Sequence, residues 1–127
     1  MHTPIDTPKA PKAIGPYSQA ILAPPFLYTS GQIGLDPLTG ILVEGGIVPQ
    51  ATQVFCNLDA ILQAAKLSFQ DVVKTTIFLT DLDDFACVNE IYAHYFGPTF
   101  PARSTVQVSR LPREAKIEIE VIAHQKI

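Results

Sequence analysis

Arg103 is the residue whose surroundings point most clearly to chemistry. It lies in the segment Phe100-Pro101-Ala102-Arg103-Ser104-Thr105-Val106, and no acidic residue occurs within ten positions on either side. A buried charge needs a partner, and the planar fork of arginine matches a carboxylate through parallel hydrogen bonds. A small anionic ligand would supply that partner. The alternatives are an ion pair with a distant carboxylate, such as Glu118 or Glu120, or a side chain that extends to water.

Two glutamates near the C-terminal end could complete an acid/base site. The run Lys116-Ile117-Glu118-Ile119-Glu120-Val121-Ile122-Ala123 alternates in polarity, so both carboxylates point to the same face of the expected strand. Tyr17 and Ser30 add an aromatic ring and a hydroxyl group. The arginine would hold a substrate carboxylate in such a pocket, and a glutamate would orient or deprotonate a water molecule. The competing interpretation is a solvated sheet face without a site.

The other reactive residues fit fewer kinds of site. His2, His94 and His124 are scattered, without the spacing of metal ligands. The sequence contains neither a glycine-rich phosphate loop nor a Gly-x-Ser-x-Gly elbow. Cys56 and Cys87 lack Cys-x-x-Cys spacing, and we expect both to be reduced and buried. A net charge of −3, an isoelectric point near 5.5 and the absence of a basic run speak against nucleic-acid binding.

The hydrophobic periodicity predicts a sheet with two helices on one face. Apolar residues at three- and four-residue steps predict the helices, which are 49–65 and 85–96. Alternating and β-branched runs predict the strands, which are 15–20, 26–33, 71–80, 103–109 and 116–123. Residues 1–13 are rich in proline, which predicts irregular chain. The order β-β-α-β-α-β-β places Arg103, Glu118 and Glu120 together on the face without helices.

The first two strands contain two informative positions. Pro24-Pro25 separates them and predicts a hairpin turn. Gly31, near the end of the second strand, permits a β-bulge or the close approach of another group to the backbone. The alternative is an ordinary strand end.

Length and composition fit one domain spanning residues 1–127. Charged residues make up 17%, against about 25% in ordinary soluble domains. Either another subunit covers part of the surface, or the surface is simply poor in charge. Pro4, Pro8 and Pro11 occur where a signal peptide needs an apolar core, and the apolar run from Ile21 to Tyr28 is too short for a membrane span. We therefore expect a cytoplasmic protein that does not bind membranes.

Five short motifs resemble, in order and spacing, those of one known family. They are Ile14-Gly15-Pro16-Tyr17-Ser18-Gln19-Ala20, Thr29-Ser30-Gly31-Gln32-Ile33, Val73-Lys74-Thr75-Thr76-Ile77-Phe78-Leu79, Phe100-Pro101-Ala102-Arg103-Ser104 and Lys116-Ile117-Glu118-Ile119-Glu120. Each motif is weak alone, but all five in register are specific. The sequence resembles the RidA/YjgF family of reactive-intermediate deaminases. The resemblance implies a chorismate-mutase-like α/β fold with a single mixed six-stranded sheet, two helices on one face, and a homotrimer with clefts between subunits.

The resemblance also implies an activity. In that family, enamines and imines released by pyridoxal-phosphate-dependent serine and threonine dehydratases are hydrolysed to 2-oxo acids and ammonia. The implied enzyme is a 2-iminobutanoate/2-iminopropanoate deaminase that needs no cofactor and no metal. Its partner would be a small imine, enamine or 2-oxo acid. The preferred imine and the dehydratase that releases it stay open.

The site residues follow from the same resemblance. Arg103 resembles the residue that binds the substrate carboxylate, and Glu118 the residue that positions the attacking water. The residues that resemble pocket-lining positions are Tyr17, Ser30, Gly31 and Asn89. Glu120 stays open as the alternative to Glu118. Thr105 stands where many relatives carry cysteine, and its hydroxyl group still offers a hydrogen bond to substrate.

Two other functions remain open from the sequence. One is a trimer that binds or senses a small 2-oxo acid without catalysis, through the same arginine. The other is an endoribonuclease or chaperone-like role, which the family resemblance also allows. The acidic composition opposes the ribonuclease, because RNA binding relies on basic side chains.

Overall fold

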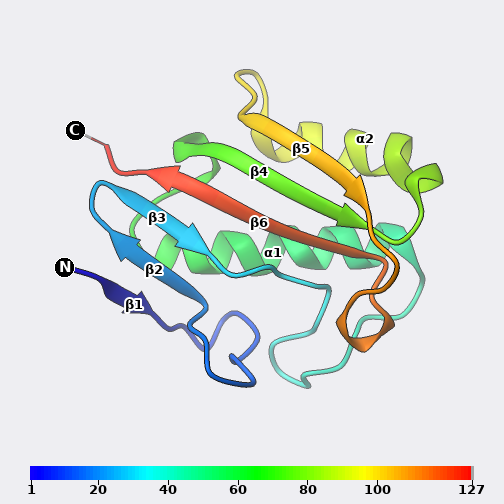
Figure 1. Ribbon diagram of the computed structural model, residues 1–127, viewed down its shortest axis with the longest axis horizontal. Coiled ribbons are helices and arrows are strands. Elements are labelled where there is room, and N and C mark those ends of the chain that lie inside the picture. Colours follow the sequence, from blue (N-terminus) through cyan, green and yellow to red (C-terminus); the bar gives the residue numbers. More distant parts are fainter. Residues whose placement is uncertain (127) are drawn as a thin grey trace.

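The two helical patterns form helices that lie on one face of a single mixed sheet (Figure 1). The computed structural model describes residues 1–126. Within these residues the two α-helices are α1, Ile47–Ala64, and α2, Phe85–Phe96. The six strands of the same range are β1 (Thr3–Ile5), β2 (Ala20–Ala23), β3 (Phe26–Thr29), β4 (Val72–Leu79), β5 (Ala102–Gln107) and β6 (Ile117–His124). The predicted fold class is confirmed.

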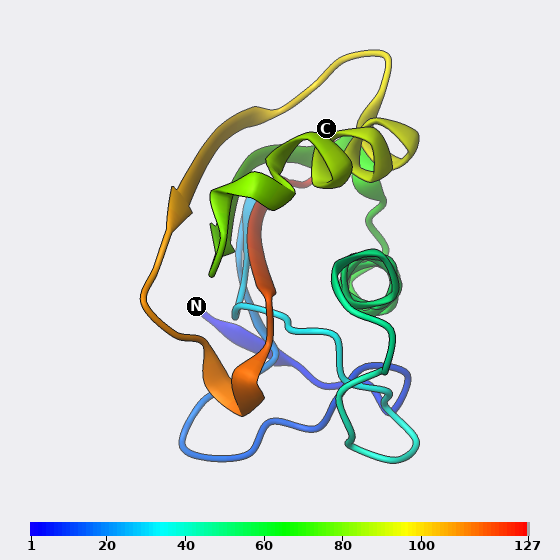
Figure 2. The same ribbon diagram turned by 90° about the vertical axis from the view of Figure 1, so that its right-hand side faces the viewer.

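The strand order is β1-β2-β3-β6-β4-β5, so the last strand of the chain lies inside the sheet and β5 lies at an edge. Neighbouring strands run antiparallel, except for β4 and β5, which run parallel because α2 returns the chain across the sheet before β5 begins. Figure 2 shows the sheet from its edge, with both helices on the same side. Among residues 1–126, no α-helix lies against the other face of the sheet (Figure 2).

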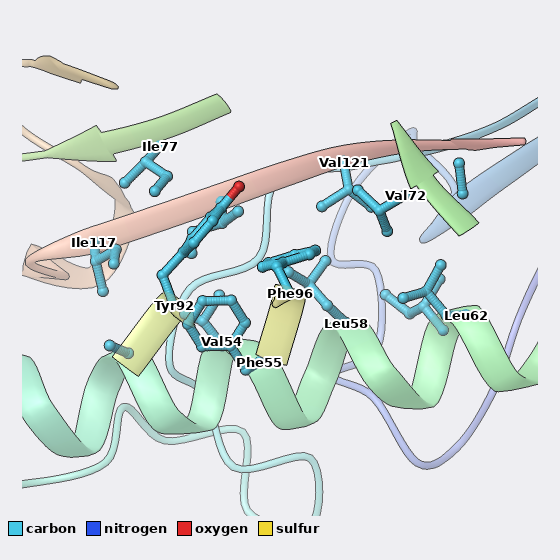
Figure 3. Close-up of a cluster of buried hydrophobic side chains, with 14 of the residues drawn as sticks. Val54, Phe55, Leu58, Leu62, Val72, Ile77, Tyr92, Phe96, Ile117 and Val121 are labelled. Atoms are coloured by element: carbon cyan, nitrogen blue, oxygen red, sulfur yellow. The ribbon is translucent and has the colours of Figure 1, made fainter. Parts of the chain in front are cut away.

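The core forms where α1 packs against the sheet. Its apolar stripe is fully shielded from solvent and consists of Val54, Phe55, Leu58, Ile61 and Leu62. Figure 3 shows such side chains directed from the helix toward the strands. Each buried side chain of this size contributes about 1.5–3 kcal/mol relative to an exposed one. The packing therefore fixes β6 against α1.

Strand β6 follows the predicted alternation. Ile117, Ile119 and Val121 are buried against the helices, while Glu118 and Glu120 are half-buried on the opposite face. A slip of one residue would move the whole apolar set to the other face, so the hydrophobic pattern fixes the register. The core thus determines where both carboxylates point.

The N-terminal segment departs from the sequence prediction. Residues 1–13 were expected to be irregular, and this is wrong for Thr3–Ile5, which form strand β1 beside β2. The strand is short and lies at the sheet edge, where a proline such as Pro4 is tolerated because its missing N–H can face away from the ladder. The hairpin turn at Pro24-Pro25 is confirmed, but its first strand is β2, Ala20–Ala23, and the prediction of a strand over 15–20 is wrong.

The cysteines are free, as predicted, but the expectation that they are buried is wrong. Cys56 is exposed and Cys87 is only partly buried. Cys56 directly follows the buried Phe55 on α1, and the turn of the helix carries it to the outer side. Among residues 1–126, no helix is long and apolar enough to cross a membrane.

Candidate active site

A pocket of about 490 Å³ has the Glu118 side chain in its wall. This volume lies within the range of small-molecule sites. The N-terminal loop, the chain after β3, the turn before β6 and β6 itself all contribute to it. We call it the Glu118 pocket, and its lining residues include Lys12, Tyr17, Ser30, Gly31, Arg113 and Glu118. The structure therefore brings together four of the residues that the sequence pointed to.

Gly31 lies against the Glu118 carboxyl group. Pairing between β3 and β6 resumes at a bridge from Gln32 to Ile119, so the three residues Thr29–Gly31 lie opposite only two residues of β6. This extra residue is a β-bulge. A Cβ atom on Gly31 would lie only 2.6 Å from the carboxyl carbon of Glu118. Both predicted roles of this glycine, a bulge and a close approach, are confirmed.

Glu118 has the electrostatic setting of an acid/base group. Burial raises the pKa of its carboxyl group, and the negative charge of Glu120 on the same face raises it further. A carboxyl group with a raised pKa exchanges its proton closer to neutral pH, which suits general acid/base catalysis. Glu120 is not among the residues that line the pocket. It acts on the pocket through its charge.

Gln19 is a residue of this region whose role the sequence did not reveal. Its side-chain oxygen accepts a hydrogen bond from the Thr7 N–H at 2.8 Å, and its amide nitrogen lies within hydrogen-bonding distance of three carbonyl groups of the same loop. The shortest of these bonds, 2.9 Å, goes to Pro11, a lining residue of the pocket. Gln19 is 2% exposed. The amide thus holds the N-terminal loop in place over the Glu118 pocket.

Ser30 and Tyr17 have local hydrogen bonds as well. The Ser30 hydroxyl donates to the Ser18 carbonyl at 2.6 Å, which leaves its oxygen lone pairs free to accept. The Tyr17 hydroxyl accepts from the Ile14 N–H at 3.3 Å, and the Tyr17 side chain is exposed. Tyr17 is therefore available at the pocket mouth, while Ser30 offers an acceptor inside it.

The Arg103 guanidinium lies over two aromatic rings of α2. Its Cζ atom is 4.8 Å from the ring centroid of Tyr92 and 5.3 Å from that of Phe85. These two positions are seven residues apart, so the helix presents them on one side. A hollow of about 290 Å³ lies here, and Asn89 lines it together with Arg103 and Tyr92. We call Arg103, Phe85, Asn89 and Tyr92 the Arg103 shelf.

Arg103 is not on the face that the sequence predicted. It pairs with Thr75 on β4, which in turn pairs with Val121 on β6, and all three lie on the helix side of the sheet. Glu118 lies on the opposite face, so the prediction that these charges share one face is wrong. Polarity was a poor guide because β5 is an edge strand, where an arginine can pack its stem inward and lay its charge on aromatic rings. An ion pair with Glu118 or Glu120 within one chain is thereby excluded.

Thr105 shares the inner face with Arg103 and lines neither hollow. Its hydroxyl oxygen is shielded from solvent and has no hydrogen-bond partner within residues 1–126. A buried hydroxyl without a partner is costly. The position therefore has an unused donor and acceptor two residues beyond Arg103.

The two groups of residues are separated within one chain. The loop over the Glu118 pocket lies below the sheet in Figure 1, whereas α2 and β5 lie at the opposite edge. In Figure 2 the same parts are again at opposite ends. Within residues 1–126 the Glu118 pocket and the Arg103 shelf thus do not meet, and we call them the acid/base half and the cation half of the candidate site.

Comparisons with known proteins point to one family. A family model described as endoribonuclease L-PSP matches residues 7–125. A human protein named 2-iminobutanoate/2-iminopropanoate deaminase is 54% identical over 121 residues, which cover 95% of this chain and 88% of the human protein.

Solved structures agree with these sequence matches. A Yersinia pestis protein, YyfA, described as a member of the conserved Rid family, superposes with a TM-score of 0.95 at 54% identity, covering 98% of this chain and 99% of that one. Escherichia coli TdcF, solved with bound serine, gives a TM-score of 0.93 at 45% identity, covering 98% and 99% of the two chains. The similarity thus extends over nearly the whole chain in both sequence and structure.

Proposed function

The chain belongs to the RidA/YjgF family, and from this membership we propose that it is a 2-iminobutanoate/2-iminopropanoate deaminase. The observation that supports the proposal is the presence, in one chain of this family, of a guanidinium at Arg103 beside a hollow and of a pocket carboxyl group with a raised pKa at Glu118. A human relative at 54% identity bears the name of this activity. The substrate would be a short 2-imino acid or its enamine tautomer.

Each half of the site has its own part in the reaction. The Arg103 guanidinium binds the substrate carboxylate through parallel hydrogen bonds and fixes the imine carbon in place. Glu118 takes a proton from a water molecule as that water adds to the carbon of the C=N bond, and it returns the proton to the nitrogen to give a carbinolamine. Glu118 then moves the proton of the carbinolamine hydroxyl group to the nitrogen, so that the C–N bond breaks, the C=O bond forms, and ammonia and the 2-oxo acid are released. General acid/base help of this kind contributes typically about 10²–10⁴-fold.

We propose a homotrimer as the active form, because the two halves of the site lie on different faces and edges of one chain. The sheet face without helices carries Tyr28 and Val106, which are 45% and 43% exposed, and also the half-buried Phe78. Apolar groups on an open face favour a covering partner. A ring of three copies, each presenting its cation half to the acid/base half of the next, would use this face and complete three sites.

The direct test follows the fate of a generated imine. A serine-consuming dehydratase releases 2-aminoacrylate in the presence of semicarbazide, and the measurement is whether the purified protein diverts it to pyruvate. We expect wild type to compete with the trap and Arg103→Ala to lose nearly all activity. The matched control is Arg110→Ala, since Arg110 is exposed and lines neither hollow. Wild-type rates in Arg103→Ala would refute the assignment.

A mixing experiment tests the shared site. Arg103→Ala and Glu118→Gln should each be inactive as pure proteins. If each site takes one half from each of two subunits, random mixed trimers restore about one quarter of the wild-type sites. The two variants are unfolded and refolded together, and wild type is the refolding control. If the mixture recovers no activity, the site is not shared between copies.

Two other functions, RNA cleavage and the sensing of a 2-oxo acid, are tested by parallel assays on the same purified protein. The family model carries the description endoribonuclease, so RNA cleavage by the purified protein is measured in parallel. The net charge of −3 leads us to expect no salt-dependent RNA binding. Saturable binding of 2-oxobutanoate without any imine turnover would instead favour a sensing trimer.

A further inference from the structure

Tyr92 contacts both the hydrophobic core and the Arg103 guanidinium. It is 4% exposed, and its ring faces the Arg103 guanidinium at 4.8 Å. The ring also packs against Phe96, with centroids 4.4 Å apart, and so belongs to the hydrophobic core. Figure 3 shows the ring rising from α2 with its hydroxyl group directed toward the sheet. One end of this side chain is thus anchored in the core while its face supports the cation.

The hydroxyl group of Tyr92 is fixed from the sheet side. It forms a 2.8 Å hydrogen bond with the Thr75 hydroxyl, and Thr75 is fully buried. Thr75 is also the direct cross-strand neighbour of Arg103. The ring therefore bridges two adjacent strands: its tip binds the residue on β4, and its face lies under the residue on β5.

The contact between Tyr92 and Arg103 is one between a cation and a neutral ring. Burial raises the pKa of the Tyr92 hydroxyl, although the Thr75 hydrogen bond and the Arg103 charge oppose this effect. The phenol stays protonated, so the attraction comes from the negative face of the ring rather than from a phenolate. An attraction of this kind orients the planar guanidinium and leaves its N–H groups free to donate to a ligand.

We propose that Tyr92, held by Thr75, is a positioning residue that orients the Arg103 guanidinium for the substrate carboxylate. A free arginine side chain samples many rotamers, and binding a carboxylate would have to restrict them. The ring restricts the cation in advance, so that less entropy is lost when the substrate binds. This inference rests on the proposed deaminase function, because the carboxylate is that of the imino acid.

The experiment replaces the ring and separates KM from kcat. In Tyr92→Leu the packed volume is largely kept and the ring face is lost, and we expect KM to rise about 3- to 30-fold with a smaller change in kcat. Tyr92→Phe keeps the ring face and loses only the Thr75 hydrogen bond, so its KM should rise less than that of Tyr92→Leu. Calorimetric titration with 2-oxobutanoate should show the same order in Kd. Tyr95→Leu is the matched control, because Tyr95 lies on the same helix, stacks on Phe55 and lines neither hollow.

A second pair of variants keeps the shape of the side chain constant. Pentafluorophenylalanine reverses the charge distribution of the ring without changing its size much, so Tyr92→pentafluorophenylalanine should raise KM and Kd relative to Tyr92→Phe. This comparison holds even if Tyr92→Leu does not fold. A merely structural role predicts lower stability with equal KM for the two aromatic variants, and that result would overturn the inference.

The outcomes for wild type separate this inference from the proposed function. Wild-type turnover together with an unchanged KM in folded Tyr92→Leu refutes the positioning role alone. A wild type that neither turns over imines nor binds 2-oxobutanoate refutes the deaminase proposal, and the positioning role with it. The positioning role is also refuted if Tyr95→Leu raises KM as much as Tyr92→Leu does. In that case any loss of packing on α2 would be enough to raise KM.

Discussion

The two halves of the candidate site are held by different physical means. The Glu118 pocket is built largely from irregular chain, and buried amides fix that chain through hydrogen bonds. Gln19 holds the N-terminal loop, and the Asn57 side-chain amide donates to the carbonyl groups of Ile33 and Leu35. The Arg103 shelf is built from one helix and one strand, and aromatic packing fixes it.

This difference predicts how each half fails. Hydrogen bonds are directional, and removing one buried partner leaves the other unsatisfied at a cost of about 1–3 kcal/mol. Aromatic packing is spread over many small contacts and tolerates a conservative replacement. The Glu118 pocket should therefore be sensitive to single atoms, whereas the Arg103 shelf should lose function by degrees.

Gly31→Ala should be the most damaging small change. The added methyl group would lie 2.6 Å from the Glu118 carboxyl carbon, so either the carboxyl group or the bulge must move. A displacement of about 1 Å at a catalytic group can cost about 10²-fold in rate. We expect kcat/KM in the imine assay to fall by at least that factor, with the folded state retained.

Gly40→Ala is the control for this prediction. Gly40 has a φ of +71°, and a Cβ there would meet no atom within 4 Å. The replacement introduces backbone strain of about 1 kcal/mol without touching Glu118. If Gly40→Ala loses as much activity as Gly31→Ala, the loss in Gly31→Ala cannot be assigned to contact with the Glu118 carboxyl group.

Gln19→Leu should weaken both stability and activity. The buried amide makes hydrogen bonds to Thr7, Ala10 and Pro11, and leucine leaves these backbone groups without partners. We expect the free energy of unfolding to fall by about 2–4 kcal/mol in urea titrations. The control Gln63→Leu removes an exposed glutamine bonded to Asp59 on α1, and should change stability by less than about 0.5 kcal/mol. Equal effects would mean that burial of the amide is unimportant.

Glu120→Gln should shift the pH dependence of the reaction. The charge of Glu120 contributes to the raised pKa of Glu118, so its removal lowers that pKa. If the carboxylate of Glu118 is the active base, the acid limb of the kcat/KM profile moves to lower pH. An acid limb that stays in place would mean that Glu118 does not control the rate.

The same variant makes a prediction for stability. Because burial and Glu120 raise the pKa of Glu118 in the folded protein, the folded state keeps its proton to higher pH than the unfolded chain does. Stability is then fully present below the unfolded pKa and decreases as pH rises through the folded pKa. Glu120→Gln should reduce this decrease, which thermal melts across the acidic range would measure against wild type.

Much of the fold was predictable because the core determines it. The three- and four-residue spacing of α1 and the alternation of β6 follow directly from the need to bury Leu58, Ile117 and Ile119. Strand β1 could not be found in this way. It has only three residues, and its evidence lies in pairing with β2 rather than in its own composition.

The site was predictable in its residues but not in its arrangement. Motif spacing pointed to Tyr17, Ser30, Gly31 and Glu118, which do line one pocket. The sequence placed Arg103 on the wrong face of the sheet, because a polar residue on an edge strand can lie on either face. Its cross-strand pairing with Thr75 shows which face it occupies. Gln19 and Tyr92 were missed because their roles depend on contacts with segments distant in sequence.

Thr105→Val should change activity and stability least among these variants, and it tests one atom next to the cation half. The change replaces a buried hydroxyl that has no partner within the described chain by a methyl group of the same size. In an isolated chain this removes an unsatisfied polar atom, so stability should stay equal or rise by up to about 1 kcal/mol. If a substrate or a second copy completes the hydrogen bond, valine instead raises KM a few-fold or weakens the assembly. Thermal melts, KM and sedimentation measured on one preparation separate these outcomes. A large loss of kcat would show that the cation half, too, depends on a single atom, and the contrast between the two halves would fail.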